Sequence, residues 1–154
     1  MKAAIFDLDG TLLDSMWIWV SIGIEPPKDL REKLKPLSLL KGCHYIKDRF
    51  NINKTAEQIN DEMEKLLESY YSSKFELRPY VKETLEKFKG NNIRMCVATA
   101  TAEHLVLKAF DRLGIGNYFE FIQTCNNTGI GKFDPEFFKL AINRLNIEPR
   151  DMGF

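Results

Sequence analysis

The first ten residues constrain the fold more than any other part of the sequence. Ala3 to Leu8 is a short, almost continuous apolar run, and it leads directly into the acidic and glycine residues Asp9 and Gly10. A strand without polar alternation is typical of a sheet that is covered on both faces. We therefore expect a central, buried strand at the very start of the chain.

The half of the chain after Phe75 alternates between strand patterns and helix patterns. The expected strands are Ile93 to Ala98, Phe119 to Thr124 and Met152 to Phe154. The expected helices are Pro79 to about Phe88, a helix capped by Thr101 and ended by Gly114, and a helix that starts at Asp134-Pro135. This alternation predicts an α/β fold, with a parallel sheet, flanking helices and right-handed crossovers.

Residues 15–75 have a different character, with both tryptophans, the pair Pro26-Pro27 and then mostly helical patterning. Thr55 and Gln58 have the spacing of a helix capping box. The apolar residues behind them recur at helical spacing, which predicts one buried face: Ile59, Met63, Leu66, Leu67 and Tyr70. We expect a small α-helical cap at 15–75, inserted into a core that is formed by 1–14 and 76–154.

Composition excludes several classes of function. The 22 basic and 22 acidic residues cancel, so no electrostatic footprint for nucleic acid or for an anionic membrane is present. The longest apolar run, Met16 to Ile24, is too short to span a bilayer, and the N-terminus lacks the pattern of a signal peptide. The three cysteines show no paired spacing, which favours reduced thiols in a cytoplasmic protein.

Polar side chains follow each expected strand at the point where it ends. Asp7 and Asp9 end the first strand, Thr99 and Thr101 follow the second, and Lys132 follows the third. Ligands of parallel α/β sheets bind beyond the carboxyl ends of the strands. We therefore expect these side chains to lie close together at one edge.

Two carboxylates at positions 7 and 9 would point to opposite faces of a regular strand. Gly10 permits the bend that would let them converge. Converging carboxylates repel each other, and a hard cation with oxygen ligands removes that repulsion. Mg²⁺ is the cofactor that this arrangement predicts.

The remaining polar groups suit a phosphoryl group. The compact charge of Lys132 can hold both a carboxylate and a phosphate. The Thr99 hydroxyl and the nearby residues Gly10, Thr11 and Ala100 can offer hydrogen bonds to its non-bridging oxygens. Because carboxylates also act as nucleophiles toward phosphorus, this set predicts phosphoryl transfer through an aspartyl-phosphate.

The segment DLDGT at Asp7 to Thr11 resembles the signature of the haloacid dehalogenase-like superfamily. The resemblance continues with VAT at Val97 to Thr99 and GKFDPEFF at Gly131 to Phe138. It is nearest to the phosphatase and β-phosphoglucomutase-like branch, which inserts a helical cap where residues 15–75 fall. The resemblance implies a Rossmann-like core and a hydrolase that uses magnesium.

It also implies roles for individual residues. Asp7 would be the nucleophile and a Mg²⁺ ligand, and Asp9 the general acid/base with its backbone carbonyl on the metal. Thr99 would bind the phosphoryl group, and Lys132 would steady Asp7 and the developing charge. An aspartate at position 9 favours phosphate esters over C–Cl or C–P bonds, because the dehalogenases and phosphonate-cleaving relatives lack it.

Three functions stay open at this point. The first is Mg²⁺-dependent hydrolysis of a small phosphomonoester, for example a sugar phosphate. The second is a β-phosphoglucomutase-like phosphosugar mutase. The third is an incompetent relative that acts as a binding module, because the family's last acidic metal-binding motif should begin where the given sequence ends, at Phe154. We expect the 154-residue chain itself to be weakly active or inactive.

Each candidate also has a plainer interpretation. Asp7 and Asp9 could form a solvated turn, Thr99 could be a helix cap, and Lys132 could be a loop lysine. Cations of the expected cap could contact substrate, although surface charge is the more ordinary role: Lys41, His44, Lys47 and Arg49. Trp17 and Trp19 are expected to pack rather than to bind a ligand. Substrate identity and oligomeric state stay open.

Overall fold

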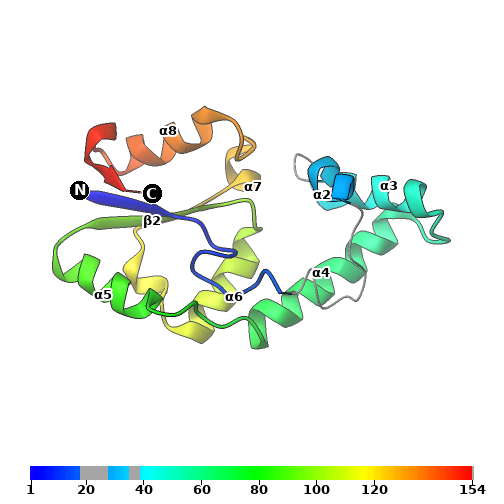
Figure 1. Cartoon of the computed structure of the whole chain (residues 1–154), viewed down its shortest axis with the longest axis horizontal. Coiled ribbons are helices and arrows are strands. Elements are labelled where there is room, and N and C mark those ends of the chain that lie inside the picture. The colour runs from blue at the N-terminus through cyan, green and yellow to red at the C-terminus, as the bar shows by residue number, and fades with distance from the viewer. Residues whose placement is uncertain (18–27, 35–38, 154) are drawn as a thin grey trace.

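The computed structural model of the chain describes residues 1–17, 28–34 and 39–153. Its centre is a parallel sheet of four strands in the order β3-β2-β1-β4, with helices on both faces (Figure 1). The strands are β1 (Ala3–Phe6), β2 (Arg94–Thr99), β3 (Ile122–Thr124) and β4 (Met152–Gly153). The expected α/β fold with a parallel sheet is confirmed.

β1 lies in the interior of the sheet, between β2 and β4. Ala3 is in register with Arg94 on one side and with Met152 on the other. The strand ends at Phe6, two residues before the apolar run ends, because the chain then turns. The carbonyl of Leu8 accepts hydrogen bonds from the backbone amides of residues 11, 12 and 13, as in a helical turn.

Two of the expected boundaries were wrong by a few residues, and a third is only partly covered by the described residues. β3 begins at Ile122 rather than Phe119, because a 3₁₀ turn at Gly116–Tyr118 precedes it. The helix after Pro79 begins at Val81, because Tyr80 has a left-handed backbone (φ 66°) that no α-helix can include. The last strand is described only as far as Gly153, and Phe154 lies outside the described residues.

α5 (Val81–Gly90) and α6 (Glu103–Leu113) cover one face of the sheet, and α8 (Pro135–Arg144) covers the other (Figure 1). Two expected caps are confirmed. Asp134 accepts a hydrogen bond from the Glu136 amide at 2.9 Å, and Gly114 ends α6 with φ 66°. The expectation that Thr101 caps α6 was wrong: the helix follows Ala102, and the Thr101 hydroxyl is bound elsewhere.

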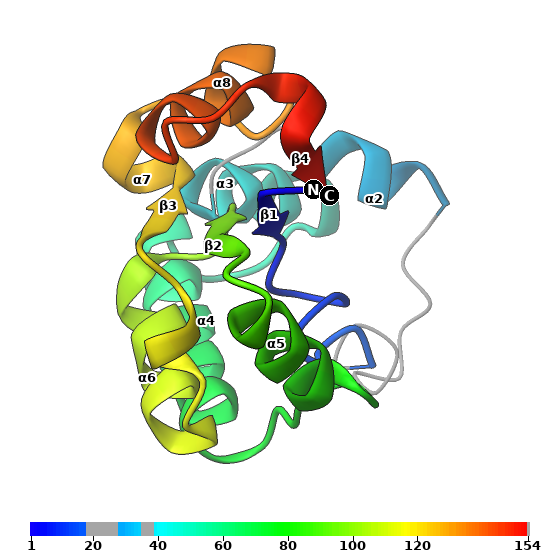
Figure 2. The ribbon, with the colours of Figure 1, turned by 90° about the vertical axis from the view of Figure 1, so that its left-hand side faces the viewer.

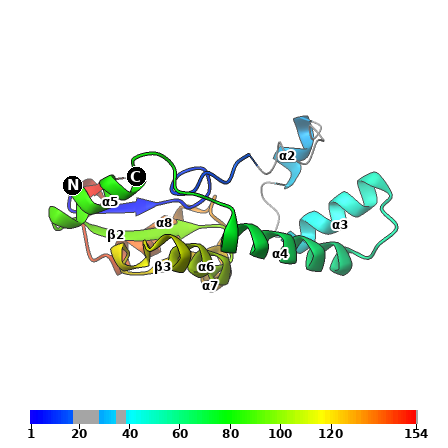
Figure 3. The same ribbon diagram turned by 90° about the horizontal axis from the view of Figure 1, so that it is seen from below.

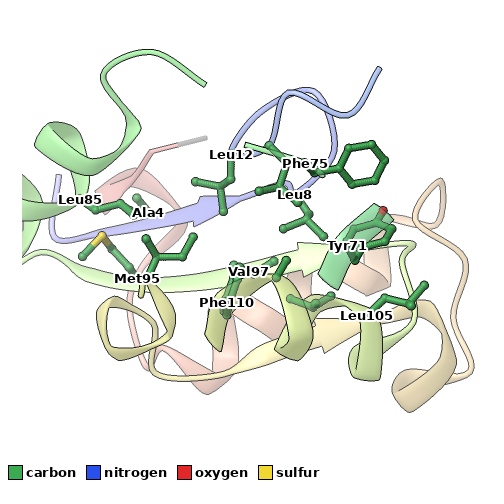
Figure 4. Close-up of a cluster of buried hydrophobic side chains, with 14 residues drawn as sticks. Ala4, Leu8, Leu12, Tyr71, Phe75, Leu85, Met95, Val97, Leu105 and Phe110 are labelled. Atoms are coloured by element: carbon green, nitrogen blue, oxygen red, sulfur yellow. The ribbon is translucent and has the colours of Figure 1, made fainter. Parts of the chain in front are cut away.

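The core lies on both sides of the sheet. On the side of α5 and α6, a buried cluster joins the strands to both helices and to the turn after β1, as Figure 4 shows for Ala4, Leu8, Leu85, Val97 and Phe110. On the other side, residues of β1 and β2 pack against the buried face of α8. Each large buried apolar side chain stabilises the fold by about 2 kcal/mol. This packing on both faces explains the continuous apolar strands.

The segment between β1 and α5, which we call the inserted segment, contains α2 (Lys28–Leu34), α3 (Leu39–Phe50) and α4 (Ala56–Ser73). Figure 3 shows α2 and α3 at the far end of the molecule from the N-terminus, with α4 leading back to the sheet. The predicted capping box is confirmed, because the Gln58 amide donates to Thr55 Oγ1 at 3.1 Å and the Thr55 amide donates to Gln58 Oε1 at 2.9 Å. Within the described part of the chain, this segment is helical.

α4 connects the inserted helices to the core. It packs along α6, as Figure 2 shows, and Lys108 on α6 pairs with Glu68 on α4 at 2.7 Å. The predicted buried face of α4 was only partly right. Leu66 is 40% exposed, while Tyr71, which was not on the expected face, is 4% exposed. The last residues of α4 therefore contact the core through a partly different set of side chains than the sequence indicated.

Two remaining expectations concern tryptophans and membranes. Trp17 packs against the rings of Tyr70 and Phe75, with centroid distances of 5.7 and 5.8 Å. Trp19 lies outside the described residues. None of the helices in residues 28–34 and 39–153 combines the length and apolarity that a membrane span requires.

Candidate active site

The predicted site residues gather at the carboxyl ends of the strands. Asp7 and Asp9 follow β1, Thr99 is the last residue of β2, and Lys132 follows β3 through the short helix α7 (Cys125–Thr128). Lys132 Nζ lies 2.6 Å from Asp7 Oδ2, although the two residues are far apart in the sequence. The parallel sheet is what brings them together, as expected from its strand order.

The bend after β1 depends on Gly10. Its backbone is left-handed, with φ 74°, and its amide donates to the Leu13 carbonyl at 2.9 Å. A Cβ at this position would lie 2.9 Å from Met16 Cγ, closer than carbon atoms normally approach. Glycine therefore satisfies both the backbone conformation and the space in this turn.

Asp7 is held by one cation and one amide. Its Oδ2 pairs with Lys132, and its Oδ1 accepts a hydrogen bond from the Leu8 amide at 2.8 Å. The Asp7 side chain is 36% exposed and that of Lys132 is 26% exposed, so both can be reached from solvent. An exposed carboxylate beside a fixed ammonium group can act as a nucleophile toward a phosphoryl group that the same ammonium attracts.

Asp9 is held in a different way, by three hydroxyl groups. Ser15 Oγ and Tyr71 Oη both donate to Oδ1 at 2.7 Å. Thr101 Oγ1 donates to Oδ2 at 2.6 Å. Hydrogen bonds from hydroxyls to an ionised carboxylate are short and strong. Both oxygens of Asp9 therefore have a defined orientation.

Thr99 is buried, with 1% of its surface exposed, and its Oγ1 accepts a hydrogen bond from the Thr101 amide at 3.2 Å. A hydroxyl that accepts one bond still has its hydrogen to donate. The amides of Gly10 and Thr11 donate within the turn, to Leu13 at 2.9 Å and to Leu8 at 3.3 Å. A phosphate at those two amides would have to replace these bonds. Ala100, the last of the predicted phosphate-binding residues, is exposed next to Thr99.

Two residues of the site were missed in the sequence. Ser15 is 3% exposed and Tyr71 is 4% exposed, yet both carry polar groups to Asp9. Burial and the nearby charge of Asp9 raise the pKa of the Tyr71 phenol far above its usual range, so it remains a hydrogen-bond donor. The spacing Leu67, Tyr71 and Phe75, four residues apart, was the signal for this buried stripe.

Three of the four residues of the inserted helices that were candidates for substrate contact lie beside acids. Arg49 binds Asp29 at 2.7 Å, and His44 lies 3.7 Å from Glu57. Lys47 lies 3.7 Å from the adjacent Asp48. These contacts favour the interpretation of surface charge for the three residues.

A magnesium ion needs oxygen ligands. In the part of the chain that the structure describes, no group of three or more His, Cys, Asp or Glu side chains is arranged to hold a metal ion. The Asp7 carboxylate and the Asp9 main-chain carbonyl are an oxygen-only set. Mg²⁺ is often bound by one or two carboxylates, with water and substrate phosphate completing its octahedron, so oxygen donors of this kind are chemically suited to that ion.

Comparisons with known proteins found a matching family model and similar curated proteins. A family model described as haloacid dehalogenase-like hydrolase matches residues 1–154. A phosphorylated carbohydrates phosphatase of Thermotoga maritima is 27% identical, and the match covers 97% of this chain and 73% of the relative. A β-phosphoglucomutase of Bacillus subtilis is 26% identical, over 98% of this chain and 73% of the relative.

Solved structures agree on the architecture. CbbY from Rhodobacter sphaeroides in complex with phosphate superposes with a TM-score of 0.75 at 18% identity, covering 99% of this chain and 76% of that one. At this identity the likeness concerns the fold alone. The chain thus spans about three quarters of the length of each of these three proteins.

Proposed function

The chain belongs to the haloacid dehalogenase-like hydrolase family and is a phosphohydrolase, and we propose that it hydrolyses a small phosphomonoester, such as a sugar phosphate, with Mg²⁺ as cofactor. One observation carries the proposal: the exposed Asp7 carboxylate pairs with Lys132 at 2.6 Å, beside a second carboxylate, Asp9, that is oriented by three hydroxyls. The groups that we propose as nucleophile, phosphate-binding cation and acid/base are thus close together at the carboxyl ends of the strands.

In the first step the Asp7 carboxylate attacks phosphorus and the bond from phosphorus to the ester oxygen breaks. Protonated Asp9 gives its proton to the departing alcohol oxygen. In the second step water attacks the aspartyl-phosphate, and the Asp9 carboxylate takes a proton from it. Inorganic phosphate leaves, and Asp7 returns to its free carboxylate form with Asp9 protonated again.

Lys132 and Thr99 act on the charge of the phosphoryl group. Lys132 holds Asp7 in line for attack and offsets the negative charge on the transferring oxygens. The Thr99 hydroxyl donates to one of those oxygens. Mg²⁺ held by Asp7 and the Asp9 carbonyl would supply further positive charge at the phosphate.

The partner we propose is a small phosphorylated metabolite in the cytoplasm. The phosphatase relative that is named for phosphorylated carbohydrates supports the substrate class. The cysteines Cys43, Cys96 and Cys125 are free thiols, which fits a reducing compartment. The net charge of zero gives no attraction to nucleic acid.

A phosphosugar mutase is the second candidate, and the similarity to the β-phosphoglucomutase of Bacillus subtilis favours it. A mutase returns the phosphoryl group from Asp7 to a sugar hydroxyl, whereas a phosphatase gives it to water. The two differ in product, since only the phosphatase releases inorganic phosphate in proportion to the substrate consumed.

The test is phosphate release by the purified chain from 4-nitrophenyl phosphate and from a panel of sugar phosphates, with Mg²⁺ and with EDTA. We expect slow release with Mg²⁺, in keeping with the weak activity expected of the 154-residue chain, its loss in EDTA, and a decrease of roughly 1,000-fold or more in Asp7→Asn, which keeps the shape but removes the nucleophile. Asp111→Asn, on the exposed face of α6, is the matched control. Equal rates in the wild type and Asp7→Asn would disprove the assignment, and conversion to an isomeric sugar phosphate without free phosphate would favour the mutase.

A further inference from the structure

Tyr71 joins the inserted helices to the acid/base carboxylate. It lies near the end of α4, and its ring is buried in the core next to Leu8 and Phe75 (Figure 4). Its hydroxyl donates to Asp9 Oδ1 at 2.7 Å. Within the described residues, it is the only group of α4 that contacts either of the two carboxylates.

The position of Tyr71 is fixed by several contacts that do not involve Asp9. Its ring packs edge-on against Phe75, with centroids 4.9 Å apart and planes at 88°. Arg112 of α6 donates to the backbone carbonyls of Tyr71, at 3.4 Å, and of Phe75. The same guanidinium pairs with Glu76 at 3.1 Å. The Tyr71 hydroxyl is therefore delivered to Asp9 by a rigid element rather than by a loop.

A carboxylate on a turn can rotate about its side-chain torsions, and each donor with a fixed position restricts that rotation. The other two donors, Ser15 and Thr101, lie in connecting segments between regular elements. Tyr71 is the donor on a helix, and its ring and backbone are held by contacts that do not involve Asp9. It therefore restricts the rotation of Asp9 from a regular element of the fold.

We propose that Tyr71 is a positioning residue that sets the orientation of the Asp9 carboxyl group for proton transfer to the leaving oxygen. This inference rests on the proposed function, because it requires Asp9 to act as the general acid. It assigns a role in the chemistry to the inserted segment through one buried hydroxyl, and it predicts an effect that depends on the substrate.

The dependence follows from the leaving group. A sugar alkoxide leaves poorly and needs a proton from Asp9 as the bond breaks, whereas 4-nitrophenolate leaves without one. Tyr71→Phe removes the hydroxyl and keeps the buried ring. We expect kcat/KM to decrease roughly ten-fold for the sugar phosphate that the wild type hydrolyses fastest, and less than about two-fold for 4-nitrophenyl phosphate. The comparison uses kcat/KM because this constant reports formation of the aspartyl-phosphate and not its hydrolysis, in which Asp9 acts for both substrates.

Tyr70→Phe is the matched control. Tyr70 is the adjacent residue on α4, its ring also packs against Phe75, and its hydroxyl has no hydrogen-bond partner among the described residues. We expect it to leave both substrates unaffected. Thermal unfolding of both variants reports any loss of packing independently of the chemistry.

A second measurement asks whether Tyr71 acts through Asp9. In an Asp9→Asn background, Tyr71→Phe should have no further effect on 4-nitrophenyl phosphate or on the sugar phosphate. Equal losses for both substrates in the single variant, or a full additional loss in the double variant, would show that Tyr71 is only structural. A wild type that releases phosphate from neither substrate would instead remove the proposed function, and this inference with it.

Discussion

The two carboxylates of the candidate site are held by different kinds of groups. We call Asp7 and Lys132 the Asp7 side of the site, and Asp9 with its three hydroxyl donors the Asp9 side. Asp7 is partly exposed and pairs with an ammonium group, Lys132, at 2.6 Å. Asp9, only two residues further along, is bound by three neutral hydroxyls at 2.6 to 2.7 Å. Asp7 thus has a charged partner that also attracts a phosphoryl group, which suits a nucleophile. Asp9 has only neutral hydroxyl partners, which orient both of its oxygens, as proton transfer requires.

The two sides also depend on different parts of the fold. Lys132, which binds Asp7, comes from the sheet core, after β3. The donors to Asp9 come from the turn after β1, from α4 of the inserted segment and from the loop after β2: Ser15, Tyr71 and Thr101. Damage to the inserted segment should therefore impair proton transfer while the nucleophile remains intact. Variants on either side can test this division.

The largest effect in this comparison is expected on the Asp7 side. Lys132→Met keeps the length of the side chain and removes its charge. We expect kcat to decrease about 100- to 1,000-fold, because Asp7 loses its partner and the transferring oxygens lose a cation. The decrease should be similar for 4-nitrophenyl phosphate and for sugar phosphates, because attack on phosphorus is common to both. Steady-state rates on the two substrates measure it.

Lys139→Met is the control for Lys132→Met, since Lys139 is an exposed lysine on α8 that pairs with Glu136. It should leave the rates unaffected. If Lys132→Met instead affected sugar phosphates far more than 4-nitrophenyl phosphate, the division between a nucleophile side and an acid/base side would be wrong.

The sequence was sufficient to predict the fold and the Asp7 side of the site. The apolar strand pattern indicates the parallel sheet, and a parallel sheet brings strand-end residues together whatever their distance in sequence. Asp7 and Lys132 follow directly from that rule, and their 2.6 Å contact confirms the predicted proximity. Gly10, with φ 74°, has the bend that its position indicated.

The donors to Asp9 could not all be predicted in the same way, because Ser15 and Tyr71 do not follow the end of a strand directly. Tyr71 lies on a helix whose relation to the sheet depends on packing against α6, and a single helical period does not specify which of Tyr70 and Tyr71 faces the core. Thr101 matched the pattern of a helix cap, but a charged acceptor competes for the same hydroxyl, and Asp9 binds it instead. Which residues donate hydrogen bonds to Asp9 is therefore determined by tertiary contacts.

A smaller effect is expected from Thr101→Val, which replaces the hydroxyl with a methyl group of similar shape. Asp9 Oδ2 accepts from Thr101, the one donor to this oxygen among the described residues. We expect a decrease of roughly ten-fold in kcat/KM for sugar phosphates and little change in kcat/KM for 4-nitrophenyl phosphate. Thr101→Ser, which restores a hydroxyl, should recover most of the rate. Failure of the serine variant to recover would indicate a role for the threonine methyl group in packing instead.

The smallest effect is expected from Ser15→Ala. This variant tests whether the remaining hydrogen bond from Tyr71 is enough to orient Asp9. Ser15 and Tyr71 both donate to Oδ1 at 2.7 Å, so removal of one leaves the other in place. We expect kcat/KM to decrease only about three-fold for sugar phosphates and not at all for 4-nitrophenyl phosphate. In combination with Tyr71→Phe, the same change should cost far more than the product of the two single effects, because Oδ1 then loses both donors. Strictly multiplicative effects would mean that the two hydroxyls orient Asp9 independently of each other and not cooperatively.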